Sequence, residues 1–228
     1  MKLDYLNGTK YSIYQPDDMY HFNSDTELLG RFMHIHKNDH VLDIGCNNGA
    51  LLYYAKEKHA KSLCGIDLFE HVIQNARENF ERNEVEVELY VCPLQQFEHD
   101  PFDKIICNPP YFNTQNDALK NQNEYIKAAR HEEYLTLDVL FQNVKRLLKS
   151  NGSFSMVYRP DRISEVILYA NQYGFSLKRM RIAYASIHKN AKTVLFEFVM
   201  NQNTMMIVEE PAFLNDRSSF GWKGIQTK

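Results

Sequence analysis

The chain contains the stretch VLDIGCNNGALLYYA at residues 41–55, where three signals for local structure follow one another. Residues 41–44 predict a short strand, Gly45–Gly49 is a turn, and Ala50 begins an apolar run that predicts a helix. Gly45 and Gly49 lack a Cβ, so the backbone of the turn can approach a ligand closely. A strand, a glycine turn and a helix in this order predict a nucleotide-binding βα unit.

The rest of the chain continues this alternation of strands and helices. Further strands are predicted over residues 63–67, 85–91, 105–107 and 154–158, and helices over 72–80, 137–148 (stopped by Asn151-Gly152) and 163–170. The extended runs 175–184 and 193–200 are so close in sequence that they predict an antiparallel hairpin. We therefore expect an α/β protein with a mostly parallel sheet of about seven strands, helices on both faces and an antiparallel C-terminal hairpin.

The segment before this unit predicts a lead-in and one helix. Gly8 and Pro16 interrupt a polar, tyrosine-rich start, which predicts a short hairpin or an irregular segment. Ser24 with Glu27 three residues later forms a capping-box pattern, and apolar residues at helical spacing follow it. We expect a helix to begin at this point.

Two acidic residues accompany the glycine turn. The glycines are four residues apart, unlike the dinucleotide pattern G-x-G-x-x-G, and Asp43 precedes them. An acid there is unfavourable for a pyrophosphate but favourable for a ligand with a positive amino group and a sulfonium, such as S-adenosylmethionine. Asp67 ends the next strand, where an acid can accept hydrogen bonds from ribose hydroxyls. The alternative is a purely structural loop and strand end.

The stretch IICNPPY at residues 105–111 ends another predicted strand. Its two prolines fix φ and remove two N–H donors, so the strand cannot continue. Asn108 and the Pro109 carbonyl offer two acceptors, and Tyr111 offers an aromatic face. This combination suits a planar amino group such as the exocyclic amine of adenine, and predicts an amino-group methyltransferase. The alternative is an ordinary turn after a strand.

Length, charge and composition limit the kinds of protein to which this chain can belong. The 228 residues, 44% of them hydrophobic, suit one globular domain, and a net charge of −3 argues against a protein that coats nucleic acid non-specifically. No apolar run approaches the roughly 20 residues of a membrane span, and no signal-peptide pattern opens the chain. We expect a cytoplasmic protein without a membrane segment.

The metal-binding residue types do not cluster in the sequence. Cys46, Cys64, Cys92 and Cys107 each lie in or beside an apolar stretch and form no C-x-x-C pattern, so we expect buried thiols. The three histidines of residues 34–40 have no cysteine or carboxylate cluster to complete a site. We expect no metal.

The chain resembles the class I S-adenosylmethionine-dependent methyltransferases of the Asn-Pro-Pro-Tyr type, whose fold is Rossmann-like. It is most similar to the bacterial tRNA1(Val) adenine-37 N6-methyltransferases. The resemblance covers nearly the whole chain and rests on five stretches: IYQPDDMYHFNSD (13–25), VLDIGCNNG (41–49), CNPPY (107–111), ARHE (129–132) and YRP (158–160). It implies S-adenosylmethionine as cofactor and an adenine of tRNA as substrate.

The residues and the resemblance together define a set of candidate site residues. The candidate catalytic residues are Asn108, Pro109, Pro110 and Tyr111. The candidate cofactor-binding residues are Phe22, Ser24, Asp25, Asp43, Gly45, Asn47, Gly49, Asp67, Leu68, Gln95 and Asn108. The candidate RNA-binding residues are Arg130 and His131, which end a long polar loop, and the late basic residues Lys178, Arg179, Arg181, Lys189 and Lys192.

The chain departs from this family pattern at two places. Many relatives have glycine where this chain has Asn47, but asparagine tolerates positive φ, so we expect the turn to survive. Related enzymes often place an acid or amide after the third strand to hold the cofactor adenine. Here the run is Val91-Cys92-Pro93-Leu94-Gln95, so Gln95 or backbone groups would have to serve.

We expect one methyltransferase domain over residues 1–208, in which 1–37 form the lead-in and cofactor-covering helix, and a polar tail over 209–228. A monomer is favoured. Enzymes with the same motif also methylate rRNA guanine, DNA adenine or release-factor glutamine. Each usually has an additional domain or a longer chain, which this sequence does not suggest. The remaining alternative is a non-catalytic binding module with a methyltransferase fold, against which the intact motif acids, glycines and Asn108 argue.

Overall fold

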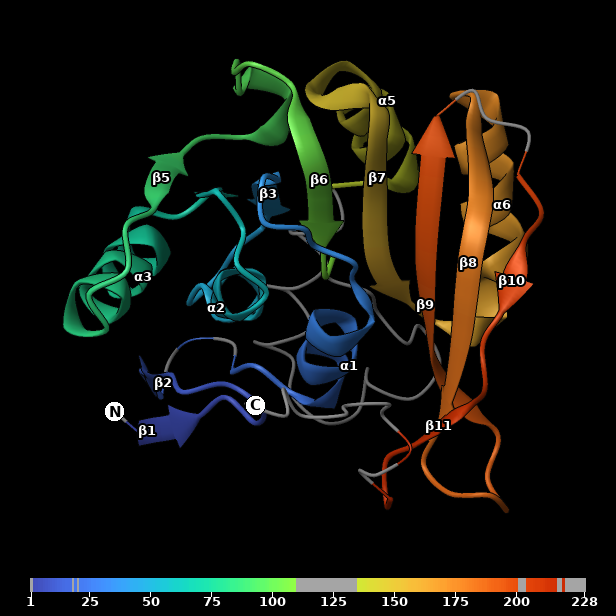
Figure 1. Ribbon diagram of the computed structural model, residues 1–228, viewed down its shortest axis with the longest axis horizontal. Coiled ribbons are helices and arrows are strands. Elements are labelled where there is room, and N and C mark those ends of the chain that lie inside the picture. The colour runs from blue at the N-terminus through green and yellow to red at the C-terminus, as the bar shows by residue number, and fades with distance from the viewer. Residues whose placement is uncertain are drawn as a thin grey trace, which may run out of the picture.

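The computed structural model describes residues 2–17, 19, 21–109, 135–200, 204–216 and 219, and one large sheet organises them (Figure 1). Its strand order is β10-β8-β9-β7-β6-β3-β4-β5, and β11 also pairs with β8. The strands are β3 (His40–Ile44), β4 (Ser62–Asp67), β5 (Glu88–Val91), β6 (Phe102–Cys107), β7 (Leu148–Tyr158), β8 (Phe175–Tyr184), β9 (Ala191–Met200), β10 (Ile207–Val208) and β11 (Ala212–Phe213).

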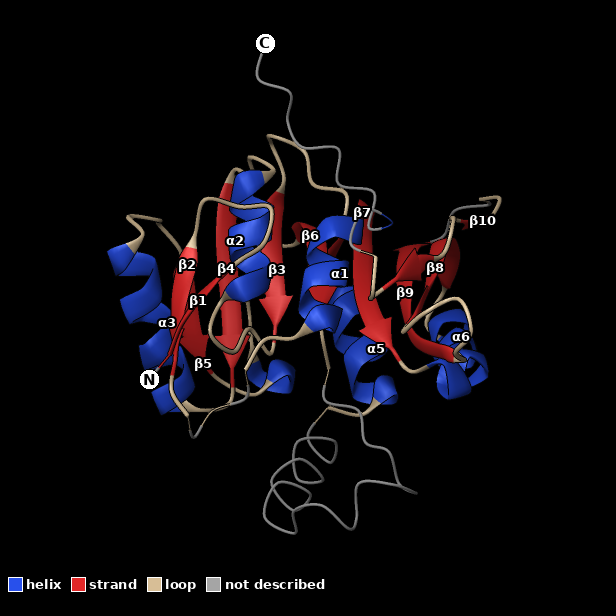
Figure 2. Ribbon diagram, turned by 90° about the horizontal axis from the view of Figure 1, so that it is seen from below, coloured by secondary structure: helices blue, strands red, loops and turns tan. Residues whose placement is uncertain are grey.

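Helices cover both faces of this sheet (Figure 2). They are α1 (Ser24–Phe32), α2 (Ala50–Glu57), α3 (Glu70–Arg82), α5 (Leu137–Leu147) and α6 (Ile163–Gln172), with the short 3₁₀ helices η1 (Leu94–Gln96) and η2 (Pro160–Arg162). One buried cluster joins α1, α2 and α3 to the sheet, and a second joins α5 and α6 to its other face. The expected α/β architecture with helices on both faces is confirmed.

Strand directions bring several loops to one edge of the sheet. Strands β3 to β7 are parallel, whereas β9 is antiparallel to both β7 and β8. The arrowheads of β6 and β7 point to the lower edge in Figure 1. Because Val194 of β9 pairs with Tyr158 at the end of β7, the β8–β9 loop lies at this carboxyl edge too. The predicted antiparallel C-terminal hairpin is confirmed, and carboxyl edges of this kind of sheet bind ligands.

Alternation along β3 decides which face Asp43 occupies. Val41 belongs to the cluster under α1–α3, whereas Leu42 and Ile44 belong to the cluster under α5 and α6. Successive strand residues point to opposite faces, so Asp43 lies on the side of α1–α3.

The N-terminal lead-in is a hairpin fixed to the outside of α3. Strands β1 (Lys2–Tyr5) and β2 (Ser12–Gln15) pair antiparallel. The Asn79 side chain accepts from Tyr14 N at 2.8 Å and donates to Tyr14 O at 3.0 Å. Its amide thus forms the two hydrogen bonds that the backbone of a neighbouring strand would otherwise form with Tyr14. Asn83 Nδ2 donates to Ser12 O at 2.8 Å. Of the two expected forms of the lead-in, the hairpin is observed.

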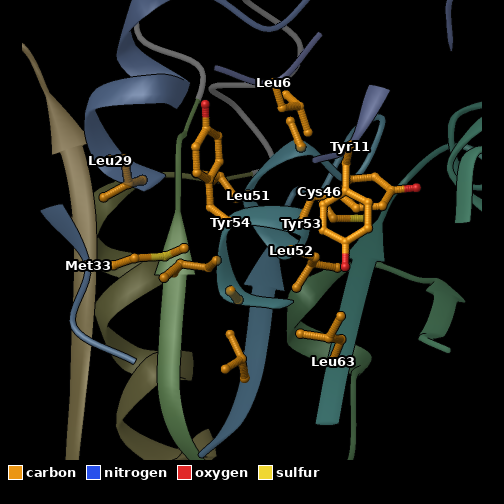
Figure 3. Close-up of a cluster of buried hydrophobic side chains, with 14 of the residues drawn as sticks. Leu6, Tyr11, Leu29, Met33, Cys46, Leu51, Leu52, Tyr53, Tyr54 and Leu63 are labelled. Carbon is orange, nitrogen blue, oxygen red and sulfur yellow. The ribbon is translucent and has the colours of Figure 1, made fainter. Parts of the chain in front are cut away.

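Helices α1 and α2 approach each other closely at Gly30. A Cβ on Gly30 would overlap the Tyr54 ring, so this crossing requires glycine. Figure 3 shows Tyr54 and Tyr53 of α2 among the buried side chains that Leu29, Met33 and Leu63 also join. The Tyr53 ring stacks on Phe80 of α3 with centroids 4.4 Å apart. The packing of α2 therefore fixes both α1 and α3.

Several predicted boundaries are wrong. Asn23, and not Ser24, caps α1: its side chain accepts from Asp25 N and Thr26 N. Helix α5 ends at Leu147, and β7 begins at once and runs through the expected Asn151-Gly152 stop. Strand β5 begins at Glu88 rather than residue 85. At the end of α5, the pairing of Leu148 with Phe102 of β6 overrides the local pattern.

Part of the expected tail belongs to the sheet edge. Within residues 209–228, β11 pairs with β8 and Ala212 is fully buried. Cys46, Cys64 and Cys107 are buried and Cys92 is half-buried, all as free thiols. Across the described ranges, none of the helices has the length and apolar character to cross a membrane.

Candidate active site

The glycine turn after β3 has the backbone that its sequence predicts. Gly45, Asn47 and Gly49 all have positive φ, at 69°, 46° and 84°. The expectation that Asn47 sustains the turn is confirmed, since its φ lies in the left-handed region. The N–H groups of Gly45 and Cys46 both donate to Ile66 O at 2.9 Å, which binds the turn to the end of β4.

The two glycines of the turn face different surroundings. A Cβ on Gly49 would overlap the Phe80 ring, so this position has a structural reason for glycine. A Cβ on Gly45 would meet nothing within 4 Å, and Gly45 lines a small open cavity. The Gly45 side of the turn is therefore the side that a ligand can approach.

The most unusual group at this cavity is Asp43. It is 1% exposed, and among the described residues neither of its carboxylate oxygens has a hydrogen-bond partner. Burial raises the pKa of the Asp43 carboxyl well above its ordinary range, and the nearby Asp67 carboxylate raises it further. A buried acceptor without a donor is unfavourable. A ligand with a positive amino group would supply the missing donors.

Asp67 ends β4 beside the same turn. Its carboxylate accepts from Asn47 N at 3.1 Å and from Phe69 N at 3.3 Å. These bonds connect the turn to the start of α3 and keep the carboxylate at the carboxyl edge of the sheet. Asp67 and Leu68 are half-buried and Gln95 in η1 is exposed, and none of the three lines the cavity. Their contacts with a cofactor remain predictions.

Asn108 enters the cavity from the neighbouring strand. Strand β6 pairs with β3 up to Cys107 opposite Ile44, so Asn108 follows at the level of the glycine turn. Asn108 is half-buried, its Nδ2 donates to Thr26 Oγ1 at 3.2 Å, and Pro109 is buried. Pro110 and Tyr111 lie outside the described residues. Asp43 and Asn108 therefore line the same cavity.

One buried amide of the lead-in bonds two residues of the cavity wall. Gln15 Oε1 accepts from Phe22 N at 2.8 Å and from Asn48 Nδ2 at 2.9 Å, and Gln15 is 1% exposed. It therefore connects the hairpin, the segment before α1 and the glycine turn. The residues that line the cavity are Phe22, Thr26, Asp43, Gly45, Cys46, Asn47, Asn48, Ala50, Leu51 and Asn108.

The N-terminal candidates divide into those at the cavity and those that hold the sheet. Phe22 lines the cavity, as expected. Asp25 does not, because its carboxylate accepts from Thr193 Oγ1 of β9 at 2.8 Å in a buried contact. Ser24 Oγ accepts from Lys192 Nζ at 3.4 Å. Thr26 and Asn48 were missed. No local spacing identifies Thr26, because Phe22 precedes the helix and the contact of Thr26 with Asn108 is long-range.

Two of the expected RNA contacts are instead buried arginines that form hydrogen bonds within the protein. Arg179 and Arg181 are 6% and 9% exposed. Arg179 Nε donates to Glu197 Oε2 at 3.1 Å, and Arg181 Nε donates to Glu210 O at 2.9 Å. Burial alone would raise the pKa of Glu197, but the Arg179 charge and hydrogen bond hold it below its ordinary value. The expectation that these two arginines contact phosphates is wrong, because their guanidinium groups are enclosed and bonded.

The other basic candidates differ in position. Lys178, Lys189 and Lys192 are exposed, and Lys178 Nζ lies 3.6 Å from Glu197 Oε1. Lys189 and Lys192 lie in and beside the β8–β9 loop at the carboxyl edge. Arg130 and His131 lie outside the described residues. Among the described residues, no group of three or more His, Cys, Asp and Glu side chains could hold a metal ion.

The sheet order, the glycine turn with its buried acid, and an Asn-Pro pair at the end of β6 define a class I methyltransferase, the class that uses S-adenosylmethionine. A family model described as a methyltransferase domain matches residues 35–210. A solved structure of a predicted O-methyltransferase from Agrobacterium tumefaciens is similar with a TM-score of 0.64 at 14% identity, covering 83% of this chain and 87% of that one. That likeness concerns the fold alone.

Sequence relatives narrow the class. The chain is 31% identical over 204 residues to a tRNA1(Val) (adenine(37)-N6)-methyltransferase of Vibrio vulnificus, covering 87% of this chain and 82% of the relative. A protein of the same name from Phocaeicola vulgatus is 26% identical over 208 residues, with 89% and 87% covered. The chain therefore belongs to the methyltransferase domain family and, within it, to the family of these tRNA1(Val) adenine-37 N6-methyltransferases.

Proposed function

We propose that the chain transfers a methyl group from S-adenosylmethionine to the N6 nitrogen of adenine 37 in tRNA1(Val). The observation that carries the proposal is the cavity lined by both the Asn108 amide and the Asp43 carboxyl group, which has no hydrogen-bond partner among the described residues. The names of the relatives supply the particular tRNA and adenine. A tRNA substrate also makes a cytoplasmic enzyme the natural expectation, and a cavity lined by residues of a single chain is consistent with a monomer.

The residues present fit the cofactor. Asp43 would bind its amino group, the open side of Gly45 leaves room for its methionine part, and Asp67 would accept from its ribose hydroxyls. Phe22 would cover it from the lead-in. S-adenosylmethionine supplies a methyl group activated on a sulfonium.

Asn108 and Pro109 would activate the target amine. The lone pair of the N6 nitrogen is delocalised into the adenine ring, so it is a weak nucleophile. Asn108 Oδ1 and the Pro109 carbonyl would each accept a hydrogen bond from one N–H of the N6 amino group. These two bonds favour a pyramidal nitrogen and stabilise the positive charge that develops on it. After the transfer the nitrogen releases one proton. No strong base is required, and alignment contributes most of the rate.

The target base must leave its stack to reach this cavity. Extrusion costs a few kcal/mol in a duplex and less in a loop. Stacking of the base on Tyr111 would return about 1–3 kcal/mol. An adenine of the anticodon loop is therefore an easier substrate than a paired adenine. Lys189 and Lys192 would contact phosphates of the same RNA.

The decisive experiment is methyl transfer from labelled S-adenosylmethionine to unmodified tRNA1(Val) transcript, followed by nucleoside analysis. The matched RNA control carries guanine at position 37, and the matched protein control is Asn108→Ala. We expect N6-methyladenosine only with wild-type protein and adenine 37. Equal labelling of the two transcripts would contradict the proposed adenine. Labelling of rRNA, DNA or release factor in place of tRNA would contradict the substrate while leaving the chemistry intact.

A further inference from the structure

The Asn108 side-chain amide lacks one hydrogen-bond partner that commonly orients an asparagine in a loop. An amide can turn by 180° and exchange Oδ1 for Nδ2 with almost no change of shape, and hydrogen-bond partners decide between the two states. The usual local partner of an asparagine side chain in a loop is the backbone N–H two residues later. Here both following residues are prolines, which have no N–H. A contact from another part of the chain can therefore decide the orientation.

Thr26 provides that contact. Its Oγ1 lies 3.2 Å from Asn108 Nδ2 and accepts from it, although the two residues are 82 positions apart. Thr26 is 5% exposed and lines the same cavity as Asn108. With Nδ2 engaged by Thr26, Oδ1 is the branch of the amide that remains for an amine. The reversed amide would present N–H groups to the N–H groups of the substrate.

The helix that carries Thr26 is fixed at both ends. At its start, Asn23 Oδ1 accepts from Asp25 N at 2.8 Å and Asp25 accepts from Thr193 at 2.8 Å. At its end, Arg179 Nη2 donates to Phe32 O at 2.7 Å. Between them, Gly30 packs against Tyr54. These contacts hold α1 against the sheet and α2, so the Thr26 hydroxyl is held in a fixed place.

We infer that Thr26 is a positioning residue for the proposed reaction: it holds the Asn108 amide with Oδ1 available to accept from the target amine. The inference rests on the proposed function. A hydroxyl can also donate, so Thr26 does not act alone. The substrate amine presents only N–H donors to Asn108. Thr26 and the substrate amine together therefore favour the orientation of the Asn108 amide in which Oδ1 faces the amine. Asn108 remains the group that touches substrate.

The test compares Thr26→Val, which keeps the shape and removes the hydroxyl, with Thr26→Ser, which keeps the hydroxyl. We expect Thr26→Val to lower kcat by about 10- to 100-fold, the size expected when a reacting group is misplaced. The KM for tRNA and the Kd for S-adenosylmethionine should remain within about twofold, because valine preserves the shape of the cavity wall at this position. Thr26→Ser should restore most of kcat.

Thr193→Val is the matched control, since it removes another buried threonine hydroxyl that bonds α1 without reaching Asn108. It should lower the melting temperature and retain most of kcat, since the contacts of α1 with Arg179 and Tyr54 still hold the helix. Three results would overturn the inference while leaving the proposed function intact: full kcat in Thr26→Val, a loss of cofactor affinity in place of kcat, or an equal loss of kcat in Thr193→Val. Absence of methyl transfer by the wild-type protein would overturn the proposed function, and the inference with it.

Discussion

At the scale of single residues, the buried position of Asp43 lowers the stability of the free protein and favours the binding of a positively charged ligand. Its carboxylate is buried beside Asp67 without a hydrogen-bond donor among the described residues. The unfolded chain releases this proton near the ordinary pKa of 3.8, whereas the folded chain keeps it to higher pH. The contribution of Asp43 to stability is therefore most favourable below pH 3.8 and is lost as the pH rises through its raised pKa.

Asp43→Asn should consequently change stability and binding in opposite directions. We expect the melting temperature of the free protein at neutral pH to increase, because asparagine does not have to hold a proton that the unfolded chain releases. The affinity for S-adenosylmethionine should fall by about 10- to 100-fold, the value of one hydrogen bond to a charged group. Thermal melts and calorimetric titrations measure the two effects. A cofactor affinity equal to that of the wild type would contradict the role of Asp43.

At the scale of elements, the two glycines of the turn have different roles: Gly49 is needed for packing, and Gly45 leaves room for the ligand. Gly49 and Gly45 both have positive φ, so a side chain at either is strained by about 1–2 kcal/mol. Only Gly49 also has a neighbour, Phe80, that a Cβ would overlap, and overpacking adds about 1–3 kcal/mol. The Cβ of an alanine at position 45 would instead enter the cavity.

We therefore expect Gly49→Ala to destabilise the protein by about 2–5 kcal/mol, the sum of these two costs. Gly45→Ala should cost only the backbone strain but should weaken cofactor binding by more than tenfold. Asn47→Gly, which relaxes a positive φ in the same turn, is the control and should preserve both properties. Denaturant melts with and without S-adenosylmethionine distinguish the variants. Equal loss of stability in the two alanine variants would refute this division of roles.

The Lys58 ammonium group caps the C-terminal end of α1. Lys58 Nζ donates to Arg31 O at 3.0 Å and to Met33 O at 2.5 Å, and so satisfies carbonyls at the end of the helix. Burial lowers the pKa of Lys58 to about 7, and the charges of Arg179 and Arg31 act in the same direction. The unfolded chain, with a pKa near 10.5, therefore binds more protons between these two values. The contribution of Lys58 to stability increases with pH across this range.

Lys58→Met keeps the length of the side chain and removes the titration. We expect the wild type to gain stability relative to Lys58→Met as the pH rises from about 7 to about 9. Melting temperatures of both proteins in one series of buffers measure this difference, and other titrating groups cancel in the comparison. Parallel curves would show that Lys58 keeps its proton throughout this range.

At the scale of the whole molecule, local patterns predicted the elements and long-range contacts decided the exceptions. The βα unit, the C-terminal hairpin and the positive φ of Asn47 follow from neighbouring residues, so the sequence sufficed. The end of α5 did not, because β7 starts early to pair with β6. Thr26 was missed because its contact with Asn108 spans 82 residues.

The two buried arginines illustrate the same limit. Alternation in β8 places Arg179 and Arg181 on one face of the strand, and this much is visible in the sequence. Which face is covered depends on how α1 and the segment after β10 pack against β8. Basic residues along a strand can thus be buried and hydrogen-bonded within the protein. Only the three-dimensional arrangement distinguishes such residues from a surface that binds nucleic acid.

This distinction leaves Lys189 and Lys192 as the described candidates for phosphate contacts at the carboxyl edge. Both are exposed, and Lys192 lies beside the start of α1, the helix that carries Thr26. An RNA whose base enters the cavity would pass its backbone near this loop. Since the chain has a net charge of −3, local positive charge there should matter for binding.

We expect the double variant Lys189→Ala/Lys192→Ala to raise the KM for tRNA by about tenfold and to reduce the slope of log Kd against log salt by about 1–2, as each lost phosphate contact removes about one released counterion. Affinity for S-adenosylmethionine and the melting temperature should stay the same. The control is Lys37→Ala/Lys61→Ala, two exposed lysines at the opposite edge of the sheet, before β3 and β4. An equal effect of both pairs would indicate general electrostatics, and only a selective effect of the first pair supports an RNA surface at the carboxyl edge.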